Sequence, residues 1–233
     1  MPQVPLPLDV NPAQSFSTYH SGTNTEVTEI LRQCAEGKGE KFIFLWGEPG
    51  MGKTHLLHAC CQLASQHRIT SCYLPLNESI TLTPSAAENL DQQQLICLDD
   101  IESISKQNQW EQTLFHIFNR VREKGNRLVI TSRHPPTGTP IQLPDLANRL
   151  TWGLPLQLRP INDNDKLAAV TLRAKNLGIE INPKVGSFLM NHYSRDLPSL
   201  WQLLEELDKA TLIAQRKLTV PFLRDYLKDR GGI

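Results

Sequence analysis

The segment Gly47-Glu48-Pro49-Gly50-Met51-Gly52-Lys53-Thr54 carries the strongest structural signal in this chain. It matches the pattern GxxxxGK[ST], in which glycines let the backbone curl until successive N–H groups point at a phosphate. The apolar stretch 41–46 before it predicts a β-strand, and the stretch 56–63 after it predicts a helix. Strand, loop and helix in this order bring the positive end of the helix to the phosphates. We therefore interpret the segment as a phosphate-binding loop rather than a chance glycine-rich turn.

The loop predicts a nucleotide-binding site in which individual residues have separate roles. All eight of its residues, and His55 directly after them, are expected to contact the nucleotide. We expect the Lys53 ammonium to lie on the β- and γ-phosphates and the Thr54 hydroxyl to bind Mg²⁺.

A second motif fits the first. The stretch 95–100 is an apolar strand that ends in two carboxylates, Asp99 and Asp100. Carboxylates beside bound phosphates are typical of a magnesium site, so Asp99 is expected to orient Mg²⁺ through water. Asp100, one residue further, is the candidate base that polarises an attacking water molecule.

A third apolar strand, 128–133, ends in polar residues. The carboxyl ends of parallel strands meet at one edge of a sheet, so we expect this end to lie between the other two. Ser132 or Arg133 is then the candidate group that senses the γ-phosphate or positions water. An ordinary transition from strand to loop explains these two residues nearly as well.

The rest of the chain divides into regions of different character. Further apolar stretches that predict strands are 72–76, 95–99, 127–131 and 156–158. They alternate with helical segments as far as residue 159, which predicts a parallel sheet with helices on both faces. Beyond that point only helical patterns appear. We expect an extended proline-rich tail over 1–12, an αβα nucleotide-binding domain over 13–160 and an all-helical domain over 161–233.

Composition excludes several classes of protein. The 233 residues contain 24 Lys and Arg against 24 Asp and Glu, which argues against a protein that coats DNA. Five cysteines with no CxxC pair predict reduced core residues and not a disulfide scaffold. The longest apolar run, 42–46, is far shorter than the roughly 20 residues of a membrane helix, and no signal-peptide pattern begins the chain. We expect a soluble cytoplasmic protein with no membrane contact.

With these motifs, the stretch 146–150 and a helical C-terminal part, the chain resembles the AAA+ ATPases of the DnaA initiator clade over residues 13–230. Three segments make the resemblance closest to the regulatory paralogues that inactivate the initiator: 3–8, 144–153 and 214–222. The resemblance implies a P-loop NTPase αβα sandwich with a five-stranded parallel sheet, followed by a small helical lid. It also implies a bound ADP or ATP with Mg²⁺.

The resemblance further implies two partners in DNA replication. Arg149 corresponds to the arginine finger that reaches the nucleotide of a neighbouring subunit, here ATP held by DnaA, whose hydrolysis prevents re-initiation. The tail resembles the peptide that docks on the DNA polymerase III β sliding clamp, and thereby indirectly on DNA. Gln3 is expected to make amide hydrogen bonds there, and Leu6 and Leu8 to fill an apolar pocket.

The resemblance leaves other points open. The lid of the family usually carries a sensor arginine where this chain has Pro198, and Arg195 is the candidate replacement. Tyr19, with Phe16 and His20, aligns with the region that lines the base pocket. The alternative functions are a helicase-loader-like or single-stranded-DNA-binding AAA+ ATPase of the same clade, and an autonomous ATPase or nucleotide kinase. Homo-oligomerisation, base preference and hydrolysis of the chain's own nucleotide are left open.

Overall fold

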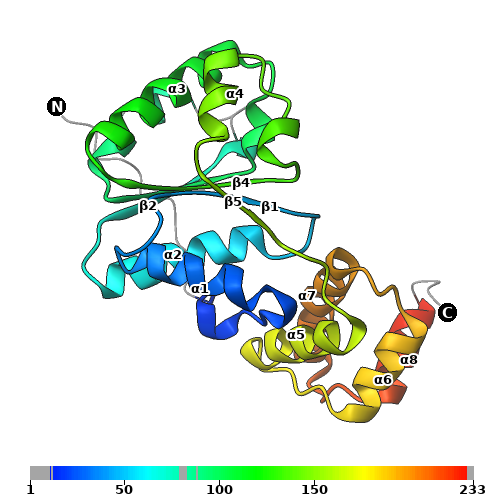
Figure 1. The fold of residues 1–233 in the computed structure, drawn as a ribbon. Coiled ribbons are helices and arrows are strands. Elements are labelled where there is room, and N and C mark those ends of the chain that lie inside the picture. Colours follow the sequence, from blue (N-terminus) through cyan, green and yellow to red (C-terminus); the bar gives the residue numbers. More distant parts are fainter. Residues whose placement is uncertain (1–10, 12, 79–82, 88, 230–233) are drawn as a thin grey trace. The chain divides into compact units, whose positions relative to one another are not determined.

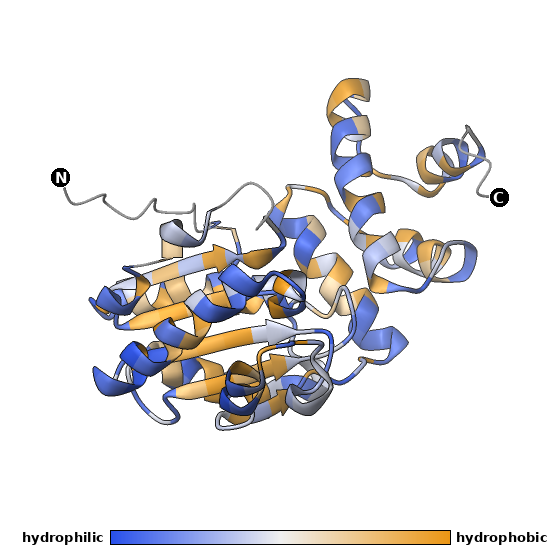
Figure 2. Cartoon of the chain, turned by 90° about the horizontal axis from the view of Figure 1, so that it is seen from above, coloured by the Kyte–Doolittle hydropathy of each residue, from blue (hydrophilic) through white to orange (hydrophobic). Residues whose placement is uncertain are grey.

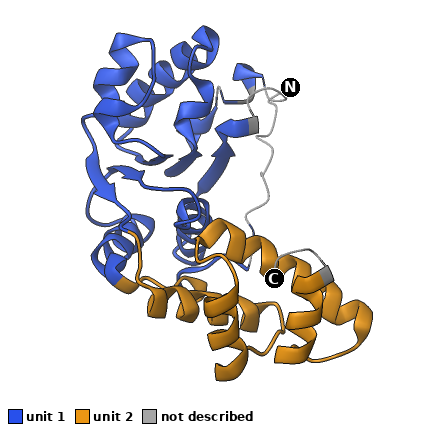
Figure 3. Cartoon of the chain, turned by 90° about the vertical axis from the view of Figure 1, so that its right-hand side faces the viewer, with its two compact units in different colours: residues 1–16, 23–159 blue, residues 17–22, 160–233 orange. Residues whose placement is uncertain are grey.

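The computed structural model describes residue 11 and residues 13–78, 83–87 and 89–229. The chain divides into two compact units, coloured separately in Figure 3: residues 1–16 with 23–159, and residues 17–22 with 160–233. The segment 17–22, which the sequence analysis assigned to the nucleotide-binding domain, therefore groups with the second unit.

The first unit is built on a parallel sheet of five strands. Its strands are β1 (Phe42–Trp46), β2 (Ser71–Pro75), β3 (Leu95–Asp99), β4 (Arg127–Ser132) and β5 (Leu154–Gln157). Their order across the sheet is β2-β3-β4-β1-β5, and every pair of neighbours is parallel. The predicted five-stranded parallel sheet is confirmed, with strand ends that lie at most two residues from those expected and with β3 at the predicted bounds.

Helices cover both faces of this sheet (Figure 1). On one face lie α1 (Thr25–Ala35) and α2 (Lys53–Gln66), and on the other α3 (Asn108–Glu123) and α4 (Pro144–Leu150). Short 3₁₀ turns occur at Phe16–Thr18, Gly22–Asn24, Leu76–Glu78, Pro84–Ala87, Leu90–Gln92, Ile101–Ile104 and Pro136–Gly138. The αβα sandwich expected from the alternation of strand and helix patterns is confirmed.

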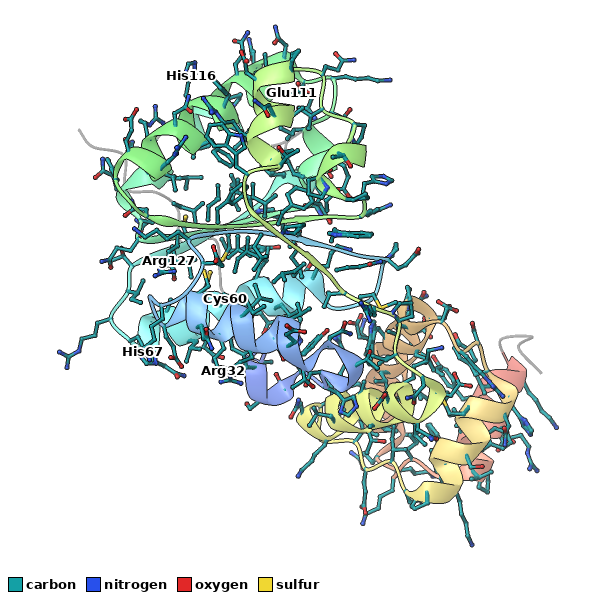
Figure 4. All side chains as sticks on the ribbon, in the orientation of Figure 1. Arg32, Cys60, His67, Glu111, His116 and Arg127 are labelled. Atoms are coloured by element: carbon teal, nitrogen blue, oxygen red, sulfur yellow. The ribbon has the colours of Figure 1, made fainter. Side chains whose placement is uncertain are left out.

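The packing of the first unit explains why its strands are continuous apolar runs in the sequence. Helices bury both faces of the sheet, so side chains pointing either way must be apolar, as the strand colours in Figure 2 show. On one face, Phe44 and Ile130 pack with Trp110 and Leu114 of α3. On α2, Cys60 is fully buried (Figure 4). All five cysteines are free thiols.

The second unit is helical over its described residues, as predicted. It contains α5 (Asp163–Asn176), α6 (Pro183–His192), α7 (Leu197–Ala214) and α8 (Val220–Asp229). The first three helices begin at side-chain caps, in which Asn162, Asn182 and Asp196 each accept a backbone N–H three residues later. Along the part of the chain that the structure describes, none of the helices has both the length and the apolar composition that spanning a bilayer requires.

Candidate functional site

The phosphate loop follows β1 at the carboxyl edge of the sheet and leads directly into α2. Gly50 and Gly52 adopt φ of 80° and 86°, in the left-handed region that only glycine enters at little cost. Gly52 is the N-cap of α2, so the first N–H groups of that helix face the loop. The backbone N–H of Gly47 donates to the Ser132 carbonyl at 3.2 Å, which fastens the start of the loop to the end of β4. The loop is thereby shaped to receive phosphate oxygens.

Lys53 is held against this loop. Its Nζ donates to the carbonyls of Gly47 at 2.8 Å and Glu48 at 3.3 Å, and the residue is only 7% exposed. Burial lowers the pKa of Lys53 below its usual value, and the nearby carboxylates of Asp100, Glu102 and Asp99 partly oppose that effect. The ammonium thus lies where the loop would hold phosphate, beside a group of acids.

Asp99 is the centre of a network of hydroxyl groups. Its Oδ2 accepts from Thr54 Oγ1 at 2.7 Å and from Tyr73 Oη at 2.9 Å, and its Oδ1 accepts from Thr131 Oγ1. The residue is 2% exposed, so these three bonds offset the cost of burying the carboxylate. Tyr73 and Thr131 were not among the predicted site residues. Thr131 lies near the carboxyl end of β4, whereas Tyr73 is the middle residue of β2 and carries no sequence signal for this site.

The Thr54 and Asp99 pair fits a magnesium ion. Mg²⁺ takes oxygen ligands and keeps several waters, so one hydroxyl and one carboxylate beside phosphate oxygens are a suitable donor set. Among the described residues, no group of three or more His, Cys, Asp and Glu side chains is arranged to hold a metal alone. A magnesium ion here would therefore depend on phosphate oxygens for part of its coordination.

Asp100 occupies a strained position at the end of β3. Its φ is 54°, and its backbone N–H donates to Thr131 Oγ1 at 2.9 Å. Asp tolerates this left-handed conformation better than most residues. Burial raises the pKa of Asp100, and the charges of Asp99 and Glu102 raise it further. A raised pKa makes this carboxylate a stronger proton acceptor.

Glu102 is an acid of this region that the sequence analysis missed. Its Oε1 accepts the backbone N–H of Arg133 at 3.1 Å and lies 3.5 Å from Arg133 Nε. Its Oε2 is buried with no hydrogen-bond partner in the described part of the chain. No motif marks Glu102, because its relation to Lys53 and Arg133 arises only when three segments meet.

The end of β4 lies between the ends of β3 and β1, as predicted. Ser132 is fully buried, and its Oγ accepts the backbone N–H of His134 at 3.0 Å. The Arg133 guanidinium is paired with Glu102 and its side chain is 59% exposed. Ser132 thus shapes the turn, and Arg133 is the more accessible of the two.

Arg149 lies in the last turn of α4, and its contacts are aromatic. Its Cζ is 3.8 Å from the centre of the Trp152 ring and 5.7 Å from that of Phe115. Its Nε is buried without a hydrogen-bond partner, and no carboxylate of the described residues lies within ion-pair distance of it. The guanidinium is therefore held in place by stacking and keeps its positive charge uncompensated.

Both parts of the chain match models of known protein families. Residues 10–157 match the model of the bacterial DnaA ATPase domain, and residues 163–227 match that of the lid domain of Hda. The chain belongs to the DnaA ATPase family. The resemblance read from the phosphate loop, the two acids and the stretch around Arg149 is confirmed at this level, and the helical second unit is a lid domain.

Solved structures similar to this DnaA-family chain have the same fold. Domain III of the Thermotoga maritima initiator DnaA has a TM-score of 0.82 at 20% identity, covering 95% of this chain and 98% of that one. AMPPCP-bound DnaA from Aquifex aeolicus has a TM-score of 0.70 at 19% identity, over 87% and 67% of the two chains. The Thermotoga maritima Holliday junction branch migration motor RuvB has a TM-score of 0.67 at 14% identity, over 94% and 72%. The fold is that of an AAA+ ATPase.

The remaining predicted site residues lie elsewhere. His55 is on α2, where its Nε2 is 2.8 Å from the Ser15 carbonyl, so it contacts the N-terminal segment of the first unit. Tyr19 belongs to the second unit. Gln3, Leu6 and Leu8, which were predicted to bind the sliding clamp, lie outside the described residues.

Arg195 is engaged within the lid domain itself. Its Nη1 donates to Asp163 Oδ2 at 2.7 Å and its Nε to the Met190 carbonyl at 2.9 Å. Pro198, the position at which the resemblance led us to expect a sensor arginine, lies in the first turn of α7, where a missing N–H costs little. A sensing role for Arg195 stays a prediction.

Proposed function

We propose that this chain binds ADP or ATP with Mg²⁺ and inactivates the replication initiator DnaA by presenting Arg149 to the ATP of a bound initiator. In the same proposal, the tail residues Gln3, Leu6 and Leu8 dock on the DNA polymerase III β sliding clamp, which brings the protein to DNA indirectly.

Nucleotide binding is supported by the shape and charge of the site. The loop offers backbone N–H groups and Lys53 offers a cation, both suited to phosphate oxygens. Thr54 and Asp99 would hold Mg²⁺, which supplies positive charge to the phosphates when bound. Similarity to a DnaA structure that contains AMPPCP adds support at the level of the fold.

Within the site, each side chain has a distinct expected task. Lys53 binds and orients the terminal phosphates. Asp100, with its raised pKa, accepts a proton from a water molecule near the γ-phosphate. Arg133, paired with Glu102 and mostly exposed, is the candidate group that responds to the presence of the γ-phosphate.

The observation that carries the regulatory proposal is the state of Arg149. The guanidinium stacks on Trp152 and has no carboxylate partner among the described residues. The two rings that it contacts, Phe115 and Trp152, are not part of the chain's own phosphate site. A planar cation held this way is suited to the oxygens of a phosphate on another molecule, where such arginines accelerate hydrolysis by roughly 10³ to 10⁵.

The proposal is tested by measuring hydrolysis of ATP bound to DnaA, in the presence of clamp loaded on DNA. The wild-type chain is compared with Arg149→Ala and Arg149→Lys. Both variants are expected to lose stimulation by about a thousandfold while keeping ADP affinity, because lysine lacks the planar donors of arginine. Undiminished stimulation by Arg149→Ala would falsify the proposal.

The clamp is tested separately by pull-down with clamp as bait. A Gln3→Ala, Leu6→Ala variant is expected to be lost from the clamp, while a Gln14→Ala variant is retained. Equal retention of the wild type and the tail variant contradicts the docking role. Strong ATP turnover by the isolated chain, or assembly on single-stranded DNA without DnaA, would instead favour the alternative functions.

A further inference from the structure

A pocket of about 500 Å³ lies at the edge of the sheet opposite the phosphate loop. It is bounded by the amino end of β1, the carboxyl end of α3 and the turn between α4 and β5. Phe42, Phe118, Val121 and Leu128 supply its apolar lining. Phe42 begins β1, and the phosphate loop begins only after its last residue, roughly 15 Å away at the usual rise per residue. This pocket is therefore separate from the nucleotide site.

The charged groups around this pocket are all positive. Lys41 and Arg122 line it and are exposed, and among the residues that the structure describes no Asp or Glu lines it. Neither cation has a carboxylate within ion-pair distance among the residues that the structure describes. The pocket thus combines an apolar lining with two uncompensated charges, and we call it the basic pocket.

Trp152 connects the basic pocket to Arg149. The indole lines the pocket and is 43% exposed. Its ring has the Arg122 guanidinium 4.5 Å from its centre and the Arg149 guanidinium at 3.8 Å. A molecule that reaches Arg149 would therefore lie within a few side chains of the basic pocket.

The wall of the pocket is fixed before any partner binds. The Arg127 guanidinium, at the start of β4 (Figure 4), donates to the carbonyls of Lys38 at 2.6 Å and Glu40 at 3.0 Å. The carbonyl of Lys41 accepts the N–H of Leu128 at 2.7 Å. These bonds hold the backbone of the pocket rim, and a preformed site loses less entropy when it binds.

We propose that the basic pocket receives an acidic segment, with an apolar side chain beside its carboxylates, from the protein whose ATP Arg149 reaches. This inference rests on the proposed function. The apolar side chain packs in the pocket against Phe42 and Phe118, whose rings contact each other edge to face with centres 4.6 Å apart. The carboxylates pair with Lys41 and Arg122. Burial of the apolar group supplies affinity, and the charge pairs at the rim supply orientation and rate of association.

A protein segment fits these observations better than a nucleic acid does. A base would need a free aromatic face to stack on. The indole of Trp152 already carries two guanidinium groups, and the rings of Phe42 and Phe118 are packed edge to face against each other. The chain has a net charge of zero, so it provides no general attraction for a phosphate backbone. The apolar lining also needs an apolar group to cover it, which an acidic peptide provides.

The test is the dependence of DnaA ATP hydrolysis on the concentration of this chain. Lys41→Glu and Arg122→Glu are compared with Arg68→Glu, an exposed cation on the turn after α2. Each pocket variant is expected to raise the half-saturating concentration about tenfold, with the maximal rate retained at saturation. The control is expected to behave as the wild type. ADP affinity and the melting temperature of each variant verify that the fold is intact.

Direct binding separates the two proposals. Affinity for ATP-bound DnaA is measured by titration calorimetry, without reference to hydrolysis. Loss of affinity in Lys41→Glu, and its retention in Arg149→Ala, supports the basic pocket as the docking site. Wild-type affinity in both pocket variants overturns this inference, even if Arg149→Ala abolishes stimulation and the proposed function stands. Loss of single-stranded DNA binding or of self-association, with DnaA affinity unchanged, also overturns it.

Discussion

Thr54 Oγ1 donates a hydrogen bond to Asp99 Oδ2 at 2.7 Å, and this bond joins the first turn of α2 to the end of β3. The two residues are 45 positions apart in the chain. They meet because β1 and β3 end at the same edge of a parallel sheet, one followed by the phosphate loop and the other by the acids. The two oxygens that we expect at the magnesium ion are thus already together in the folded chain.

Replacing Thr54 should remove the contribution of magnesium to nucleotide affinity. Thr54→Val keeps the size of the side chain and deletes the hydroxyl, so affinity for ATP with Mg²⁺ is expected to fall about tenfold, the value of roughly one charge-assisted hydrogen bond. Affinity for ADP in EDTA should not change. Thr54→Ser retains the hydroxyl and serves as the control in the same calorimetric titration. Wild-type affinity of the valine variant for ATP with Mg²⁺ would contradict the assignment.

Asp100→Asn should slow ATP hydrolysis while making the folded state more stable. The amide cannot accept a proton, so single-turnover hydrolysis of ATP held by this chain is expected to fall about a hundredfold or more. Asn also tolerates the left-handed backbone. The folded state raises the pKa of Asp100, so ionising it costs stability at neutral pH.

The free energy of unfolding of this variant, relative to that of the wild type, should therefore depend on pH. Asp100→Asn should be more stable than the wild type at pH 7. The difference should shrink as the pH falls through the raised pKa of folded Asp100 and vanish well below about 4, where Asp100 is protonated in both the folded and unfolded states. Urea unfolding at pH 7 and at pH 3.5 measures it. A difference that grows as the pH falls would show that Asp100 is stabilised as a carboxylate, against the environment described here.

Glu111 holds the segment that leads into α4 (Figure 4). Its carboxylate accepts the backbone N–H groups of Lys106 at 3.1 Å, Gln142 at 3.0 Å and Leu143 at 2.6 Å, and it is 1% exposed. Leu143 is the N-cap of the helix that carries Arg149. A buried acid far from the phosphate loop thus supports the position of the proposed arginine finger.

Glu111→Ala should cost about 3 kcal/mol of unfolding free energy, because three backbone donors lose their acceptor. Glu111→Gln keeps one acceptor oxygen and is expected to cost less. Chemical denaturation measures both, with Glu123→Ala, an exposed residue of the same helix, as a control expected to stay within about 0.5 kcal/mol. Wild-type stability of the alanine variant would show that water or other groups satisfy these donors.

Gly153 leaves room for only a hydrogen atom beside Phe42. A Cβ added at Gly153 would lie 2.6 Å from the nearest atom of the Phe42 ring. Gly153→Ala is therefore expected to cost about 1–3 kcal/mol through overpacking and to distort the basic pocket. Gly138→Ala, whose nearest atom would be 3.4 Å away, is the matched control. A Phe42→Leu change in the Gly153→Ala background should recover part of the loss, and full additivity of the two changes would contradict the clash.

Local patterns were sufficient to predict the sheet and the phosphate loop. A buried strand between two helical layers must be apolar at every position, and the loop needs glycine where φ is positive, as at Gly50 and Gly52. Both requirements act within a few residues, so they are visible in the linear chain. The boundary of the second unit was also visible, because periodic strand signals stop before Pro160. The sequence did not predict that residues 17–22 group with the second unit, because short turns carry no pattern that assigns them to one unit or the other.

The amino-acid sequence alone was therefore enough to predict the fold class, the layers of helices around the sheet and the phosphate-binding segment. Folding alone brought Tyr73 and Thr131 onto Asp99, Glu102 beside Arg133, and Phe115 of α3 beside Arg149 of α4. In each case, the partners come from segments that parallel strand pairing or helix packing places together. Contacts of this kind depend on distance in space and leave no repeating signal along the chain.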